Sequence, residues 1–238
     1  MSVKLFILGN PGSGKSTAFR HIKNILEQLY PDWSIVRFHD YDILQSMFLH
    51  EKLFCAYRKD KQFCQAEHGG FDVLDFTVLD KALKKLEKQV RHRYDPLRDE
   101  LIVIEFARDN YYDALKQFKA PFLEDAYFLF IEADIDICIQ RAKERVTDPP
   151  TPDNHFVSEE ILVQYYDKRD SKKDLLATIG RKRLKVINSR GDLQDFKNKV
   201  GKYINMILSR EISKSQNKVT KKTPDPQVLT PLLVPIHH

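Results

Sequence analysis

The sequence predicts an α/β fold, in which a mainly parallel sheet is covered by helices on both faces. Short apolar runs alternate along the chain with longer segments whose apolar residues recur at helical spacing. This alternation is typical of parallel strands joined by crossover helices, and it indicates a three-layer α/β/α sandwich. A glycine-rich stretch between the first strand and the first helix supports the same fold class, because open parallel sheets bind ligands at such turns.

Five segments are predicted as strands of this sheet. Each is a short run of apolar or β-branched residues bounded by polar or turn-forming ones, as buried strands usually are. They span residues 3–8, 34–38, 101–104, 127–131 and 184–187.

Helices are predicted wherever apolar residues recur three or four positions apart. The first follows the glycine-rich stretch, and a closing helix is capped by Asp192 and ends near Leu208. Ser158 precedes two acidic residues, which is typical of a helix start. The mixed stretch over residues 44–70 indicates only helix and loop. The remaining helices are expected from residue 72 to about 90, from 111 to about 118 and from 135 to 146.

The composition is that of a globular protein with one core. Hydrophobic residues make up 42% of the 238 positions and charged residues 31%, and no apolar run approaches the roughly 20 residues of a membrane helix. We expect one domain over residues 1–212, with residues 147–154 as an exposed loop inside it. Residues 213–238 are polar and then proline-rich, which predicts an extended tail.

The cysteines and the charge restrict location and partners. Three widely spaced cysteines predict reduced, buried thiols in the cytoplasm, and the early first strand leaves no room for a signal peptide. The net charge of +5 allows a nucleic-acid partner without favouring one, since much of the excess lies in residues 214–222. We expect no membrane partner, and the oligomeric state is left open.

Residues 9–16 match the phosphate-binding pattern G-x-x-x-x-G-K-[ST] at every fixed position. Glycines let the backbone turn its N–H groups toward a phosphate chain, and the positive end of the following helix faces the same anion. Lys15 would place an ammonium group on the outer phosphates, and Ser16 is the expected protein ligand of a phosphate-bound Mg²⁺. The sequence therefore predicts that ATP and Mg²⁺ bind through Gly9, Asn10, Pro11, Gly12, Ser13, Gly14, Lys15, Ser16 and Thr17.

Two other classes of phosphate-loop protein fit the sequence poorly. GTPases carry N-K-x-D after a buried strand, whereas the Asn-Lys pairs at 198–199 and 217–218 follow no such strand and lack the aspartate. Motor ATPases usually have larger chains and a strand that ends in aspartate, whereas the strand over 101–104 ends at Glu105.

Residues 3–208 resemble the small P-loop kinases that phosphorylate nucleosides, nucleotides, sugars or polynucleotide ends. Residues 8–17 are similar to adenylate-kinase-like and polynucleotide-kinase-like loops. Residues 139–145 resemble the R-x-x-x-R entry to a mobile lid, and residues 157–161 resemble the helix that resumes after it. The resemblance implies the strand order 2-3-1-4-5, with the active site at the carboxyl ends of the strands.

The resemblance also implies catalytic roles for arginines and one aspartate. Arg141 and Arg145 would join Lys15 in neutralising the transferring phosphate, although a solvated helix face is the competing interpretation of their i, i+4 spacing. Transfer to a hydroxyl also needs a carboxylate, and Asp40 and Asp42 lie where related kinases carry one. The expected D-x-x-R pattern is absent, because glutamine stands where the arginine would be, so either aspartate can be the base or a helix cap.

Glu105 ends the third predicted strand beside the loop, where it would hold Mg²⁺ through water or orient a substrate. Arg108 resembles the arginine of the Glu/Asp-Arg element in deoxynucleoside kinases, which implies a substrate-binding role. A structural ion pair between Glu105 and Arg108 is the alternative, because a buried acid needs a partner.

These features predict a cytoplasmic kinase that uses ATP and Mg²⁺ and acts on a small-molecule or nucleotide-like acceptor. Two alternatives stay open from the sequence. One is a nucleotide-binding regulatory ATPase that binds a partner protein, and the other is a 5′-hydroxyl polynucleotide kinase, whose oligonucleotide binding would be sensitive to salt.

Overall fold

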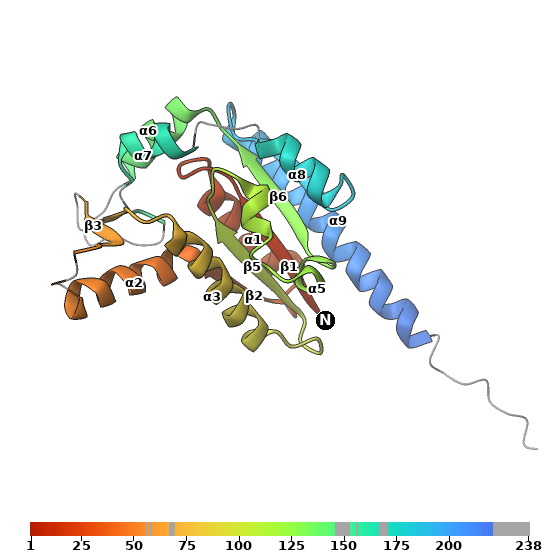
Figure 1. Cartoon of the computed structure of the whole chain (residues 1–238). Helices are drawn as coiled ribbons and strands as arrows, with labels where there is room; N and C mark the ends of the chain where they lie inside the picture. The colour runs from red at the N-terminus through yellow and green to blue at the C-terminus, as the bar shows by residue number, and fades with distance from the viewer. Residues whose placement is uncertain are drawn as a thin grey trace, which may run out of the picture.

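A five-stranded parallel sheet runs through the centre of the molecule, with helices against both faces (Figure 1). The computed structural model describes residues 1–55, 57, 59–66, 70–145, 153–155, 157–166 and 171–220. The strands of the central sheet are β1 (Ser2–Leu8), β2 (Ser34–His39), β5 (Glu100–Phe106), β6 (Tyr127–Glu132) and β7 (Leu184–Asn188).

The sheet order is β2-β5-β1-β6-β7, and every neighbouring pair is parallel. Numbered along the chain, the five strands therefore have the order 2-3-1-4-5. The predicted fold class and strand order are confirmed. Each predicted strand is present, with slightly longer bounds than the sequence pattern indicated.

The central strand β1 is buried on both faces. Phe6 and Leu8 pack into one core, whereas Leu5 and Ile7 pack into the other, because side chains alternate along a strand. Burying a side chain such as Phe6 stabilises the fold by roughly 1.5–3 kcal/mol. A strand covered on both faces is a continuous apolar run, which is why the sequence pattern identified it.

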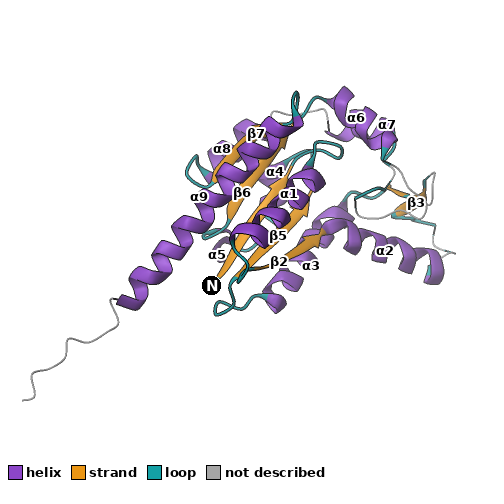
Figure 2. Cartoon of the chain, turned by 180° about the vertical axis from the view of Figure 1, so that it is seen from behind, coloured by secondary structure: helices purple, strands orange, loops and turns teal. Residues whose placement is uncertain are grey.

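Two helical layers enclose the sheet. One layer contains α1 (Lys15–Leu29) and α9 (Leu193–Thr220), which pack with the core around Leu5. The opposite layer, packed around Phe6, contains α3 (Thr77–Arg93), α4 (Tyr111–Leu115), α5 (Ala120–Leu123) and α8 (Ser171–Ile179). Figures 1 and 2 show the sheet between these layers from opposite sides.

The segment after β2 differs from the expectation. It consists of α2 (Asp40–Phe54) and a small antiparallel hairpin of β3 (Phe63–Gln65) and β4 (Phe71–Val73). The helix predicted from Asp72 is wrong at its start, because Asp72 pairs with Cys64 in this hairpin and α3 begins at Thr77. Asp75 sets that start, since its Oδ1 accepts a hydrogen bond from the Thr77 N–H at 3.0 Å.

The predicted lid region is partly described. Helix α6 (Ile135–Glu144) ends at Glu144, and its expected end at Val146 lies outside the described residues. Residues 147–152 of the expected loop also lie outside them, whereas Asp153 is half-buried rather than exposed. The helix start at Ser158 is confirmed, because its Oγ accepts from the Ile161 N–H at 3.3 Å. Helix α7 (Glu159–Ile161) then continues into the π-helical segment η2 (Leu162–Tyr166).

Helix α9 is longer than predicted. It continues past Leu208 and past the expected tail boundary to Thr220. Ile212 still packs against the core, which gives the helix an apolar contact beyond its predicted end. Residues 221–238 of the expected tail lie outside the described residues.

The thiols are free, as expected, but only Cys138 is buried, whereas Cys55 and Cys64 are half-buried. Across the part of the chain that the structure describes, no helix combines the length and the apolar character needed to cross a membrane.

Candidate functional site

The candidate site lies at the carboxyl ends of the strands, around the turn between β1 and α1. Residues 9–14 form this turn, in which the Ser13 N–H donates to the Asn10 carbonyl at 3.1 Å. Lys15, Ser16 and Thr17 form the first turn of α1. Because the first N–H groups of a helix have no partner within it, they are available to an anion held in the turn.

The turn requires glycine at two close approaches to the backbone. At Gly12, where φ is 80°, a Cβ atom would lie 2.3 Å from the Cys138 carbonyl oxygen of α6. At Gly9, where φ is 140°, a Cβ atom would lie 2.4 Å from the Ile131 carbonyl oxygen of β6. The loop is therefore pressed against the neighbouring strand and helix, and any side chain at these positions would displace it.

Lys15 is buried inside the turn. Its Nζ donates to the carbonyl oxygens of Gly9 at 2.9 Å and Asn10 at 3.0 Å. Burial lowers the pKa of Lys15, and the nearby carboxylate of Glu105 opposes that shift. The ammonium group lies inside the loop, where it could donate its hydrogen bonds to phosphate oxygens in place of these two carbonyl oxygens.

Tyr111 holds the loop from the opposite helical layer. Its buried hydroxyl accepts a hydrogen bond from the Gly9 N–H at 2.8 Å. No local sequence pattern indicates this contact, because Gly9 and Tyr111 lie 102 positions apart in the chain. The contact satisfies a backbone donor that would otherwise be buried without a partner, which is costly.

The two predicted lid arginines have different surroundings. Arg141 donates from Nη1 to Ser189 Oγ and from Nη2 to the Ser189 carbonyl, both at 3.0 Å. It faces a cavity, here called the outer cavity, on the α1 side of the loop. The outer cavity is lined by Gly12, Gly14, Ser16, Thr17, Arg20, Arg141, Glu144, Arg145, Asp153, Asn154, Ser189, Gly191, Leu193 and Phe196.

Arg145 lines the outer cavity and also a second cavity, described below, which Arg141 does not line. Its buried Nε has no hydrogen-bond partner among the described residues. Burial lowers the pKa of Arg145, while the carboxylates of Glu105 and Asp153 oppose this change. An arginine with an unused donor beside Lys15 is suited to bind an oxyanion.

The structure distinguishes the two candidate aspartates. Asp40 is buried at the start of α2 and lines the second cavity, which extends from the loop toward α2 and is described below. Asp42 is exposed and does not line this cavity. Arg108 Nη1 lies 2.5 Å from Asp40 Oδ2, so the expected alternative pair of Arg108 with Glu105 is not formed. No hydrogen bond among the described residues engages the other oxygen of the Asp40 carboxylate.

Glu105 instead pairs with an arginine that sequence analysis did not identify. Arg37 of β2 donates to Glu105 Oε2 at 2.7 Å and to Asp153 Oδ1 at 2.8 Å. Ser16 Oγ also donates to Asp153 Oδ1, at 2.7 Å. The predicted metal residues Ser16 and Glu105 therefore belong to one cluster, together with Arg37 and Asp153.

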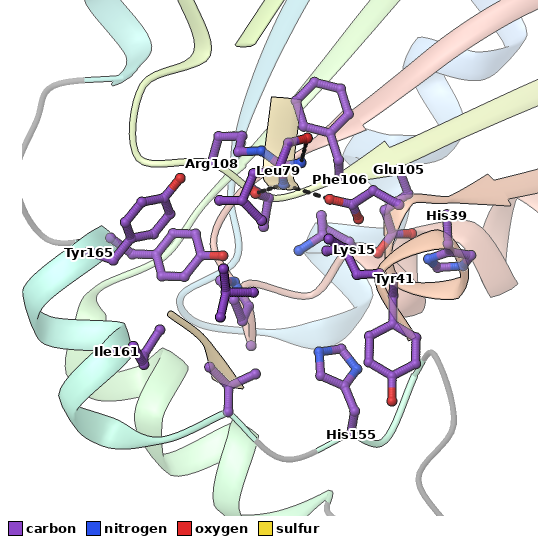
Figure 3. Close-up of a pocket in the computed structure, with 18 of the residues that line it drawn as sticks. Lys15, His39, Tyr41, Leu79, Glu105, Phe106, Arg108, His155, Ile161 and Tyr165 are labelled. Carbon is purple, nitrogen blue, oxygen red and sulfur yellow. Dashed lines mark hydrogen bonds and ion pairs between the residues drawn. The ribbon is translucent and has the colours of Figure 1, made fainter. Parts of the chain in front are cut away.

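The second cavity, here called the ring-lined cavity, opens from the loop toward α2, β4 and η2. Tyr41 stacks on Phe71 at 5.6 Å and on His155 at 4.2 Å between ring centroids. Tyr165 stacks on Phe76 at 4.7 Å. Figure 3 shows Tyr41 and Tyr165 on opposite sides of the cavity, with Lys15 between them. The cavity is therefore lined by rings at its sides and by charged groups at the loop.

The donor set of the cluster fits a magnesium ion bound to a nucleotide. Hydroxyl and carboxylate oxygens are the ligands that Mg²⁺ takes in proteins, and Ser16 and Glu105 supply one of each. The cation that holds these oxygens in the structure is the guanidinium of Arg37. Within the described residues, no group of three or more His, Cys, Asp or Glu side chains is placed to hold a metal ion.

No protein-family model matches the sequence, and no curated protein is significantly similar to it. Among solved structures, a gluconokinase from Sinorhizobium meliloti 1021 is 13% identical with a TM-score of 0.47, over 90% of this chain and 97% of that chain. A shikimate kinase from Acinetobacter baumannii in complex with shikimate is 12% identical with a TM-score of 0.43, over 88% and 95%. Similarity of this size does not identify the reaction or the acceptor of this chain.

Proposed function

We propose that the protein is a kinase that transfers a phosphoryl group from ATP, bound with Mg²⁺, to a hydroxyl of a small acceptor. The observation that carries this proposal concerns the wall of the ring-lined cavity. This wall contains the residues that would bind the transferred phosphate and also the residues that would bind and activate the acceptor. Gly12 and Lys15 of the phosphate loop form one end of its wall, and the buried Asp40–Arg108 pair forms another part of it. A phosphate on the loop and an acceptor in the cavity would therefore meet without intervening protein.

Each charged group has a role in this proposal. Lys15 and Arg145 would neutralise the transferring phosphate, which needs electrostatic stabilisation more than covalent help. Asp40 would accept the proton of the acceptor hydroxyl through its Oδ1, while Arg108 holds the same carboxylate through Oδ2. A bound Mg²⁺ would supply charge neutralisation between the outer phosphates, with Ser16 and Glu105 as its protein partners. The nucleoside part of ATP would lie in the outer cavity, near Arg141 and Phe196.

The ring-lined cavity favours an acceptor that contains a planar ring. Tyr41 and Tyr165, with the rings on which they stack, line opposite sides of the space. Stacking of a base on an aromatic side chain contributes about 1–3 kcal/mol per base in sites that bind single-stranded nucleic acid. Sugar acids and other polyols would gain less here, because their hydroxyl groups need hydrogen-bond partners rather than ring faces. We therefore expect a nucleoside-like acceptor.

The test is ATP consumption by purified protein with Mg²⁺ against separate panels of nucleosides, nucleotides, sugars, sugar acids and 5′-hydroxyl oligonucleotides. We expect turnover that depends on an acceptor with a planar ring and is lost in Lys15→Ala. Lys23→Ala is the matched control, because Lys23 lies on the same helix with its side chain 52% exposed. Tight ATP binding with no acceptor effect would contradict the kinase proposal. Turnover with sugars only would contradict the acceptor class and leave the kinase proposal standing.

A further inference from the structure

Arg37 is a nearly buried arginine that no motif predicted, with its side chain 11% exposed. Its guanidinium lies 4.5 Å from the ring centroid of Phe19, which packs against it from α1. From Nη2 it reaches Glu105 Oε2 at 2.7 Å, Asp153 Oδ1 at 2.8 Å and Ser16 Oγ at 3.2 Å. One cation therefore contacts oxygen atoms from three separate segments of the chain.

These three oxygen donors also form a set among themselves. Ser16 Oγ donates to Asp153 Oδ1 at 2.7 Å, so the hydroxyl proton points to that carboxylate and the oxygen lone pairs remain for a cation. Asp153 Oδ1 therefore lies directly against the serine that the phosphate-loop pattern assigns to Mg²⁺.

One cation makes direct contacts to both carboxylates of the cluster. Glu105 and Asp153 provide two negative charges, and Arg37 forms ion pairs with both. Lys15 interacts with Glu105, and Arg145 with both carboxylates, through charge at longer range. Arg20 lies farther away, with its Nη1 3.8 Å from Asp153 Oδ2 and its side chain 63% exposed. A divalent ion on the same oxygens would stand against the guanidinium, and two like charges at that separation repel strongly in a buried site.

We propose that Ser16, Glu105 and Asp153 form a single divalent-cation site that Arg37 occupies in the chain without nucleotide. When nucleotide-bound Mg²⁺ binds, it displaces the Arg37 guanidinium from these oxygens. Asp153 then provides the second carboxylate of the metal site, beside Glu105. Only the arrival of the metal with a nucleotide rests on the proposed function. The competition between Arg37 and a divalent ion is a property of the chain alone.

A consequence concerns the segment that carries Asp153. This residue follows α6 and precedes His155, whose ring stacks on Tyr41 in the wall of the ring-lined cavity. If a divalent ion displaced the Arg37 guanidinium from these oxygens, β2 would lose its hydrogen bond to Asp153 of the segment 153–155. The segment would stay close to Ser16. Occupation of the metal site is thereby linked to the wall of the ring-lined cavity.

The test uses divalent ions without nucleotide or acceptor. Thermal unfolding is followed during MgCl₂ titration at constant ionic strength, and Mn²⁺ binding is counted by electron paramagnetic resonance. We expect Arg37→Gln to bind one Mn²⁺ per chain at least ten times more tightly than the wild type, and to gain a saturable Mg²⁺-dependent rise in Tm. Arg20→Gln is the matched control and should behave as the wild type, because Arg20 makes no short contact to the cluster.

A second substitution keeps the result unambiguous. Asp153→Asn added to Arg37→Gln should remove most of the gained Mn²⁺ affinity. If Arg37→Gln does not fold, Arg37→Lys replaces it, because lysine keeps the charge but loses the planar fork, and it should still bind Mn²⁺ severalfold more tightly than the wild type. Mn²⁺ affinity equal to that of the wild type, or a gain that survives Asp153→Asn, would overturn the proposal. Absence of kinase turnover would not affect these readings, since no nucleotide is present.

Discussion

Asp40 and Arg108 lie 68 positions apart in the chain and form a buried ion pair, in which Arg108 Nη1 is 2.5 Å from Asp40 Oδ2. Arg108 Nη2 also donates to the Leu79 carbonyl at 2.9 Å, which ties the guanidinium to α3. Burial is the largest single influence on the pKa of Arg108 and would lower it, but the Asp40 carboxylate, together with Tyr165 and Tyr166, offsets this, and the pKa is raised. The arginine therefore stays charged beside the carboxylate that we propose as the base.

Asp40→Asn should remove acceptor-dependent turnover and destabilise the protein. We expect a loss of about 10²–10⁴ in kcat, because proton transfer contributes about that much. The free energy of unfolding should fall by about 3–5 kcal/mol, because the charge of Arg108 would remain buried without its partner. Steady-state kinetics and urea unfolding measure the two effects.

Asp42→Asn is the matched control for this substitution, because Asp42 is exposed on the same helical turn. Asp42→Asn should leave kcat and the free energy of unfolding nearly unchanged. The double variant Asp40→Asn with Arg108→Gln should recover part of the stability but none of the activity. Loss of turnover in Asp42→Asn with full activity in Asp40→Asn would assign the base to the other aspartate.

Gly12→Ala should unfold the phosphate loop, whereas Gly180→Ala should not. Both glycines have similar left-handed backbones, with φ of 80° and 77°, but only Gly12 has a carbonyl oxygen 2.3 Å from an added Cβ. Gly180→Ala should therefore cost about 1–2 kcal/mol from backbone strain alone. Gly12→Ala should cost more than that and abolish nucleotide binding, as measured by urea unfolding and calorimetric titration with ATP. If Gly12→Ala and Gly180→Ala changed the free energy of unfolding and the ATP affinity equally, the close contact of Gly12 with α6 would have no effect on either quantity.

Tyr111→Phe should weaken the loop without disturbing the core. It removes the hydroxyl that accepts from the Gly9 N–H and leaves that buried donor without a partner, at a cost of about 1–3 kcal/mol. The neighbouring Tyr112 is 47% exposed, so Tyr112→Phe controls for the loss of a hydroxyl as such. Urea unfolding and ATP affinity should both change in the first variant only. An unchanged ATP affinity in Tyr111→Phe would mean that Gly9 is held by its other contacts.

His39 should make stability sensitive to mild acid. Burial lowers its pKa below the ordinary value of 6.5, so the unfolded chain binds a proton more readily than the folded chain does. The free energy of unfolding should therefore decrease as pH falls from 6.5 toward the lowered pKa, by up to about 1.4 kcal/mol per pH unit. His39→Gln should flatten this dependence in urea unfolding between pH 7 and 5. His92→Gln, at an exposed position of α3, should retain it.

The glycine-rich turn before α1 and the five strands could be predicted because their signals are local. A glycine pattern of eight consecutive positions, between an apolar run and a helix start, needs no distant partner to be recognised. The buried strands are apolar runs for the same reason, since both of their faces are covered. The hairpin of β3 and β4 was missed because its short strands become visible only through their pairing, as with Asp72 and Cys64.

The charged residues proposed to act on the acceptor could not be assigned from the sequence, because their positions depend on contacts between distant segments of the chain. Asp40 and Asp42 are equivalent in a sequence pattern, but two steps along a helix turn a side chain by about 200°, so only Asp40 faces the cavity. Arg37 belongs to β2, yet its partners lie 21, 68 and 116 positions away, and no local spacing could relate them. The residues of the glycine-rich turn therefore predicted a phosphate-binding site from sequence alone, whereas the packing of strands and helices determined which charged side chains lie around this turn.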